Sequence, residues 1–422
     1  MTLAATLAAR TPAGRDRYVD FLRAFSILTV VCGHWLIAIF GWQDGRITVD
    51  NAVGLQSGLW AATWVLQVMP LFFFVGGFAN AAGWEAAQRR SLGYRGFLAG
   101  RLERLLRPTA VFLGVWGAVE VVLHLTDTGA PGILRGTFIP FGPLWFLGVY
   151  AAVVALSPLM LRLHRRLGGW VLAGLTLAVA AVDAVRFATG LPGIGWANLL
   201  LVWLAVHQAG FFYADGPLPG AGRRLWWALA AAGLAALAVL TNLVTVTGEL
   251  WYPRSMVGVD LEPVSNMSPP TSAILALAAW QIGAAMLLRR RVSAALQRAR
   301  LWTVVVAVNS AIMTLFLWHL TAMLLAYLAL HPLGFGRETT TSARWWAERP
   351  LWVGASAVVL LPLLWLFSRW ERPPRASAGQ DRPEPRPEPR AKPAPAAGRG
   401  RSPRRPGPFS RPGRFSPRQR EG

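Results

Sequence analysis

Three ionisable side chains lie in the first apolar segment of the chain, VDFLRAFSILTVVCGHW, which covers residues 19–35. Arg23 and His34 are separated by ten residues, and Asp20 precedes Arg23 by three. Eleven positions make almost three helical turns, so Arg23 and His34 share one face about 16 Å apart along the axis. A neutral imidazole there could serve as a general base. The alternative is an interfacial Asp20–Arg23 ion pair and a core histidine with satisfied hydrogen bonds.

A second pattern, FLAGRLERLLRP, covers residues 97–108. Arg101 and Arg104 are three positions apart and point the same way on a helix, and Arg107 continues the row. Paired guanidinium groups suit phosphate, because each offers a planar fork of donors. The alternative is that these arginines only set membrane topology, which requires charge but no particular spacing.

Other polar residues also lie within apolar segments. Glu120 and His124 are four apart, so Glu120 either supports an active site or forms a local pair with His124. His319 lies about as deep in its segment as His34 does in the first, so the two could line one cavity. We expect no metal at this site.

The composition defines the class of protein that must position these residues. Of 422 residues, 54% are hydrophobic and only 15% are charged, whereas about a quarter are charged in an ordinary soluble domain. The net charge of +22 is concentrated in a C-terminal tail and in short loops, which is the pattern of membrane topology and does not indicate nucleic-acid binding. The sequence therefore predicts an integral membrane protein in contact with lipid.

Ten apolar segments are long enough to cross a bilayer as helices. They cover residues 18–40, 59–84, 108–125, 143–161, 170–187, 196–213, 225–246, 271–288, 303–330 and 350–367, with prolines 108, 143 and 350 at expected helix starts. Arginines concentrate in alternate loops, which places both termini in the cytoplasm. We expect an all-α polytopic bundle with three parts: a cytoplasmic segment 1–17, a transmembrane domain 18–370 and a disordered Pro/Arg-rich cytoplasmic tail 371–422.

Several stretches, taken in order, carry a family resemblance. Besides the two quoted above, they are MPLFFFVGGFANA (69–81), PLWFLGVY (143–150), VHQAGFFYADG (206–216), SNMSPPT (265–271) and MTLFLWHLTAM (313–323). Together they resemble acyltransferase family 3, bacterial integral membrane enzymes that O-acylate sugars, envelope polysaccharides and secondary metabolites. The resemblance covers nearly all of residues 17–370. One departure is Gly76, where many relatives have serine.

The resemblance implies a role for four residues. His34 matches the catalytic histidine, Arg23 its motif partner, and Arg101 and Arg104 the pair that engages acyl-CoA. The implied enzyme sits in the bacterial cytoplasmic membrane and moves an acyl group, acetyl by default, from acyl-CoA to a hydroxyl of a carbohydrate or other small-molecule acceptor. His34 acts either as the base for that hydroxyl or as an acyl carrier.

Two other functions remain open at this stage. A transporter or flippase of similar size would also carry charge within the membrane, but we find neither related halves nor a corresponding pair of Gly- or Pro-broken spans. A non-catalytic scaffold that recruits partners through its basic tail leaves Arg23, His34, Arg101 and Arg104 unexplained.

Overall fold

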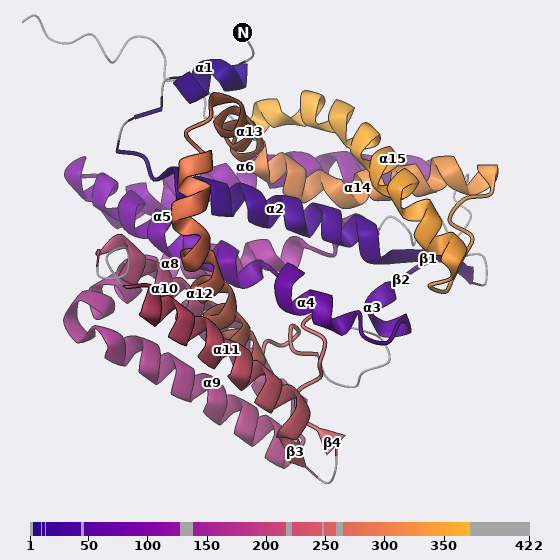
Figure 1. Cartoon of the computed structure of the whole chain (residues 1–422). Helices are drawn as coiled ribbons and strands as arrows, with labels where there is room; N and C mark the ends of the chain where they lie inside the picture. The colour runs from indigo at the N-terminus through magenta and orange to yellow at the C-terminus, as the bar shows by residue number, and fades with distance from the viewer. Residues whose placement is uncertain are drawn as a thin grey trace, which may run out of the picture. The chain divides into compact units, whose positions relative to one another are not determined.

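The computed structural model describes residues 3–9, 11–12, 14–43, 46–126, 138–216, 222–246, 249–258 and 265–371. In this part of the chain, ten helical segments are long and apolar enough to cross a membrane, and each overlaps one of the ten expected spans (Figure 1). The predicted helical membrane bundle is therefore confirmed. The predicted tail lies outside the described residues from position 372 onward, and the orientation of the termini stays a prediction.

The helices carry nearly all of the secondary structure. The α-helices are α1 (Leu3–Ala9), α2 (Arg17–Ile37), α3 (Ala52–Leu55), α4 (Trp60–Leu66), α5 (Met69–Arg89), α6 (Gly93–Leu125), α8 (Leu144–Leu167), α9 (Gly169–Thr189), α10 (Asn198–Ala214), α11 (Arg223–Leu243), α12 (Ser272–Ala295), α13 (Ala299–Ser310), α14 (Ile312–Leu330) and α15 (Ala343–Phe367). Short 3-10 helices are η1 (Ile139–Phe141), η2 (Pro192–Ala197), η3 (His331–Leu333) and η4 (Ser368–Glu371).

Two small antiparallel hairpins complete the described structure. Strand β1 (Ala38–Gln43) pairs with β2 (Arg46–Asn51), and β3 (Thr245–Val246) pairs with β4 (Glu249–Leu250). The β1–β2 hairpin follows α2 directly, so the first span ends at Ile37 and not at the expected residue 40. We call this end of the bundle the outer end, and the end at which α2 begins the inner end.

Helix α14 forms the centre of the part of the bundle that positions the site. It is buried along most of its length, and it packs against α2, α6 and α15. Figure 1 shows α2 and α14 running side by side. A helix that is apolar on all sides is typical of the core of a membrane bundle, whereas α6 and α15 expose an apolar face.

Two spans that we expected to be continuous are broken. The segment expected at 59–84 divides at Gln67–Val68 between α4 and α5, and that at 303–330 divides at Ala311 between α13 and α14. Side chains distant in sequence satisfy the freed backbone groups. Gln281 Nε2 donates to the Gln67 carbonyl at 2.9 Å, and the Glu371 carboxylate accepts from the backbone N–H of Met313 at 2.9 Å. Breaks in a span are tolerated where protein supplies such partners.

Two of the three prolines expected at helix starts lie inside helices. Helix α6 begins at Gly93, so Pro108 is internal, and α15 begins at Ala343, so Pro350 is internal; Pro143 does precede α8. The stretch 97–108 therefore lies on α6 itself. Glu371, assigned to the tail from the sequence, belongs to the folded unit because it caps α14.

Candidate active site

The structure brings His34 and His319 together. His34 lies three residues before the end of α2, and His319 lies on α14 and is fully buried. His34 Nδ1 is 3.0 Å from His319 Nε2, and the two rings stack with their centroids 5.1 Å apart. Residues 285 positions apart in the chain thus form one pair at the outer end of α2.

The second nitrogen of His319 fixes the hydrogen-bond order of this pair. His319 Nδ1 is 2.7 Å from the Phe316 carbonyl oxygen, which can only accept, so Nδ1 carries a proton. In a neutral ring the Nε2 of His319 is then an acceptor, and His34 Nδ1 must donate to it. The remaining nitrogen of His34, Nε2, carries the lone pair. The arrangement therefore presents an unprotonated ring nitrogen on His34, a protonation pattern inferred from the heavy atoms.

Packing at the outer end of α2 holds His34 in place. Trp35 Nε1 donates to the His319 carbonyl at 2.9 Å, which ties the two helices together beside the histidines. Arg349 of α15 is buried, and its Nη1 donates at 3.0 Å to the carbonyl of Ala38, the C-cap residue directly after α2. The Arg349 guanidinium also lies 3.9 Å from the centroid of the Trp345 ring. Arg349 directly precedes the span expected at residues 350–367, so the sequence alone did not place it beside α2.

Arg101 lies at the inner end with its guanidinium partly buried. It donates to the Ala79 carbonyl of α5, and it fills the space that a side chain at Gly83 would occupy. It also lies 5.8 Å from the Phe97 ring centroid. Its position is therefore fixed by the neighbouring helix α5 and by Phe97 of its own helix. An arginine that only sets membrane topology does not need such contacts.

Arg23 and Arg104 surround Arg101 with like charge. Both are close enough to Arg101 to interact electrostatically, and Glu371 attracts Arg23 from the start of α14. Arg104 is exposed, and neither Arg23 nor Arg104 forms a hydrogen bond or ion pair with another described residue. Three guanidinium groups from α2 and α6 thus converge at the inner end, an arrangement suited to an anionic ligand.

The two groups of predicted site residues occupy different levels of the bundle. Arg23 and His34 are about 16 Å apart along α2. Arg23 therefore lies with Arg101 and Arg104, which we call the arginine group, and not with the histidine pair. A ligand that uses both groups must extend along α2.

Asp20 does not pair with Arg23. Its carboxylate binds Arg15, at 2.5 Å from Nε and 3.0 Å from Nη2, because the segment before α2 brings Arg15 back over the first turn. This ion pair and the hydrogen bond raise the pKa of Arg15. The backbone carbonyl of Asp20 accepts from Asn309 Nδ2 at 2.9 Å. Asp20 thus fixes the inner end of α2, away from His34.

Glu120 lies near the outer end of α6 beside His124. The His124 ring nitrogen is 2.9 Å from the Glu120 carbonyl oxygen and 3.8 Å from its carboxylate. His124 is 67% exposed, so the local pair faces away from the core. This geometry matches the alternative reading of a local pair.

Sequence reasoning missed one buried histidine contact close to Arg101. Asn80 Nδ2 of α5 is 3.0 Å from His207 Nε2 of α10, and both residues are almost completely buried. The motif at residues 206–216 contains His207 but predicted no role for it. Two packed glycines explain the contact, because Gly77 and Gly210 let the backbones of α5 and α10 approach closely.

The departure at Gly76 has a structural setting. A Cβ there would lie 3.1 Å from the Tyr150 ring and 3.4 Å from its hydroxyl oxygen. Tyr150 also interacts electrostatically with Arg101. A serine at this position would need a small shift of the tyrosine ring, so glycine lets Tyr150 pack directly on α5.

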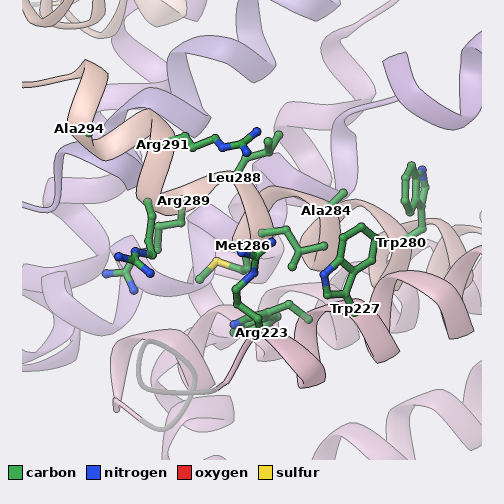
Figure 2. A pocket seen from close by; sticks show the side chains of 12 residues that line it. Arg223, Trp227, Trp280, Ala284, Met286, Leu288, Arg289, Arg291 and Ala294 are labelled. Carbon is green, nitrogen blue, oxygen red and sulfur yellow. The ribbon is translucent and has the colours of Figure 1, made fainter.

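Two features of the described residues bear on what the protein could bind. Within the described residues, no three His, Cys, Asp or Glu side chains gather closely enough to hold a metal ion. A pocket of about 860 Å³ lies between α11 and α12, and neither His34 nor His319 lines it (Figure 2).

Searches of curated proteins and of solved structures gave no match.

The fold and the paired groups define a multi-pass membrane protein with a basic nitrogen at one level and a cluster of arginines at another. The family described as "Acyltransferase domain", acyltransferase family 3, matches residues 16–369. The match covers all ten spans, so the chain belongs to this family and is an acyltransferase.

Proposed function

We propose that the protein is an O-acyltransferase of the bacterial cytoplasmic membrane that moves an acyl group, acetyl by default, from acyl-CoA to a hydroxyl of a carbohydrate or other small-molecule acceptor. The observation that carries this proposal is the 3.0 Å contact between His34 and His319, which directs the lone pair of His34 Nε2 away from the pair. The family match supplies the class of reaction.

The arginine group is the proposed donor site. CoA carries several phosphate groups, and Arg23, Arg101 and Arg104 present forked donors at the end of the bundle that the positive-inside rule assigns to the cytoplasm. The long pantetheine arm would extend along α2 and bring the thioester toward His34. This places Arg23 in donor binding rather than in proton transfer.

In the direct mechanism, His34 Nε2 removes the proton from the acceptor hydroxyl. The oxygen attacks the thioester carbonyl, the C–O bond forms, the C–S bond breaks, and the CoA thiolate takes the proton back from His34. His319 then acts as a positioning residue, because its Nε2 accepts from His34 Nδ1 and orients the ring, and this hydrogen bond strengthens as His34 becomes protonated.

In the alternative mechanism, His34 Nε2 attacks the thioester itself. The C–S bond breaks, CoA leaves as the thiolate, and an acyl-histidine forms. The acceptor hydroxyl then attacks the acyl carbon, the C–N bond to His34 breaks, and the hydroxyl proton is released and protonates the CoA thiolate. The place of His34 near the outer end of α2, about 16 Å from Arg23, favours an acceptor that arrives from the outer side.

The decisive test uses membranes that contain the full chain, supplied with acetyl-CoA labelled in the acetyl group. We expect label in an ester that mild alkali releases, and a fall of about 10²- to 10⁴-fold in the His34→Ala variant. His124→Ala, which removes an exposed imidazole, is the matched control. Unchanged labelling in a correctly inserted His34→Ala protein would refute the assignment.

A rapid-quench experiment without acceptor distinguishes the two mechanisms. Label that becomes attached to the protein, is released by hydroxylamine and is lost in His34→Ala indicates an acyl-histidine. If the protein carries no label while turnover with acceptor continues, His34 acts as a base.

A further inference from the structure

A basic and apolar pocket lies between α11 and α12, away from the residues of the proposed reaction. It has a volume of about 860 Å³, and four arginines line it: Arg223 of α11 and Arg289, Arg290 and Arg291 of α12. Its other described lining residues are tryptophan, leucine, methionine and alanine, with no acidic side chain among them. Figure 2 shows Arg223 and Trp227 on one helix beside Met286 and Ala284 of the other.

The shape of the pocket follows from how the two helices cross. Gly283 lies against the backbone of Trp226 and Ala230, and Gly233 lies against that of Trp280. These close approaches bring α11 and α12 together along the length of the pocket wall. The side chains of Trp227 and Met286 line the pocket beside the arginines (Figure 2).

The depth and exposure of the apolar wall match half a bilayer. Arg289 and Trp280 are nine residues apart on α12, which is about 14 Å along the helix. The hydrocarbon core of a bilayer is about 30 Å thick, so this distance is about one leaflet. Trp227 is 59% exposed and Leu288 is 51% exposed, so the pocket opens outward to the membrane.

The arginines make the pocket selective for negative charge. Arg289 is engaged by Asp16 at 3.9 Å and by the Tyr213 ring, which fixes its position. Arg223 and Arg290 are exposed and form no hydrogen bond or ion pair with other described residues. Basic pockets between helices on the cytoplasmic side suit lipid headgroups.

We propose that this pocket binds an anionic phospholipid, with its phosphate at Arg223 and Arg290 and its acyl chains along Trp227 and Trp280. The leaflet follows from the positive-inside prediction, which places these arginines on the cytoplasmic side. The site is separate from the arginine group and the histidine pair, so it does not depend on the proposed reaction.

The test measures lipid binding to the purified full chain in neutral detergent by native mass spectrometry. Phosphatidylglycerol should bind more tightly than phosphatidylcholine of the same chain length. The double variant Arg223→Gln/Arg290→Gln should bind phosphatidylglycerol roughly thirty-fold more weakly, at roughly five-fold for each arginine near an anionic surface. Arg162→Gln/Arg166→Gln is the matched control, because it removes two exposed arginines of α8 outside the pocket.

A second variant separates the pocket from surface charge. Ala284→Phe fills the apolar part without changing the charge, and it should also lower phosphatidylglycerol affinity. Unchanged binding in this variant, or equal losses in the two arginine pairs, would overturn the proposal. So would full competition by inorganic phosphate, which indicates a free-anion site, or by CoA, which indicates a nucleotide site.

Discussion

The histidine pair and the arginine group differ in how many of their hydrogen-bonding groups have partners within the protein. At the outer end, one nitrogen of His34 and both nitrogens of His319 have partners within the protein. At the inner end, Arg101 has a carbonyl partner, but Arg23 and Arg104 have none among the described residues. The difference indicates a rigid reaction centre and a donor-binding region that leaves hydrogen-bond capacity for its ligand.

The largest expected effect tests the rigid centre through His319. His319→Ala should lower kcat for acyl transfer by about 10²-fold with little change in the KM for acyl-CoA, because His34 loses the acceptor that orients it. His319→Gln should recover part of the activity, since its amide oxygen can accept from His34 Nδ1. If Gln and Ala behave alike in folded protein, hydrogen-bond orientation is not the role of His319.

The next effect concerns the anchor at the end of α2. Arg349→Met should lower the free energy of unfolding by about 3 kcal/mol, because the buried carbonyl of Ala38 loses its charged donor. Denaturation in mixed micelles measures this change. Arg337→Met removes an exposed arginine nearby and should have almost no effect. Equal losses in the two variants would mean that Arg349 does not anchor α2.

A smaller effect, on acyl-CoA binding, tests the arginine group with one variant that keeps its charge and one that removes a charge. Gly83→Ala places a methyl group where the Arg101 guanidinium lies, and should weaken acyl-CoA binding by about ten-fold. Gly100→Ala on α6, where a Cβ meets no neighbour, is the control. Arg104→Ala should give a similar loss with unchanged thermal stability. Normal binding of CoA in both Gly83→Ala and Arg104→Ala would place the donor site elsewhere.

The smallest effect concerns the cap of α14. Glu371→Ala should lower the free energy of unfolding by about 1 kcal/mol, because two backbone N–H groups lose their acceptor. Glu103→Ala removes an exposed carboxylate of α6 and serves as the comparison. A change no larger than that of Glu103→Ala would show that Glu371 is dispensable for the break at Ala311.

The ten spans could be predicted because hydrophobicity over about 20 residues is a local property. The breaks at Gln67 and Ala311 could not, because their partners Gln281 and Glu371 are distant in sequence and nothing near the breaks signals them. Pro108 led to a wrong prediction of where the third span begins. A proline costs little where a helix begins, yet α6 carries it internally.

Within the candidate site, spacing predicted which residues share a helix face but not all of their partners. Equal depth predicted that His34 and His319 could meet, and they do, although the helix of His319 begins only at Ile312. The three-residue spacing of Asp20 and Arg23 suggested an ion pair between them. In the structure the Asp20 carboxylate binds Arg15 instead. Helical periodicity places side chains on a face but does not show which neighbouring segment reaches them first.

The glycine contact between α5 and α10 bears on how an acyl group could cross this protein. Gly77 and Gly210 bring the two backbones so close that a single methyl group would push the helices apart. Helices locked at this level resist the rocking by which transporters expose a site alternately to each side. On the acyl-histidine mechanism proposed above, the acyl group would move by the making and breaking of bonds at His34, while α5 and α10 stay at a fixed distance from each other.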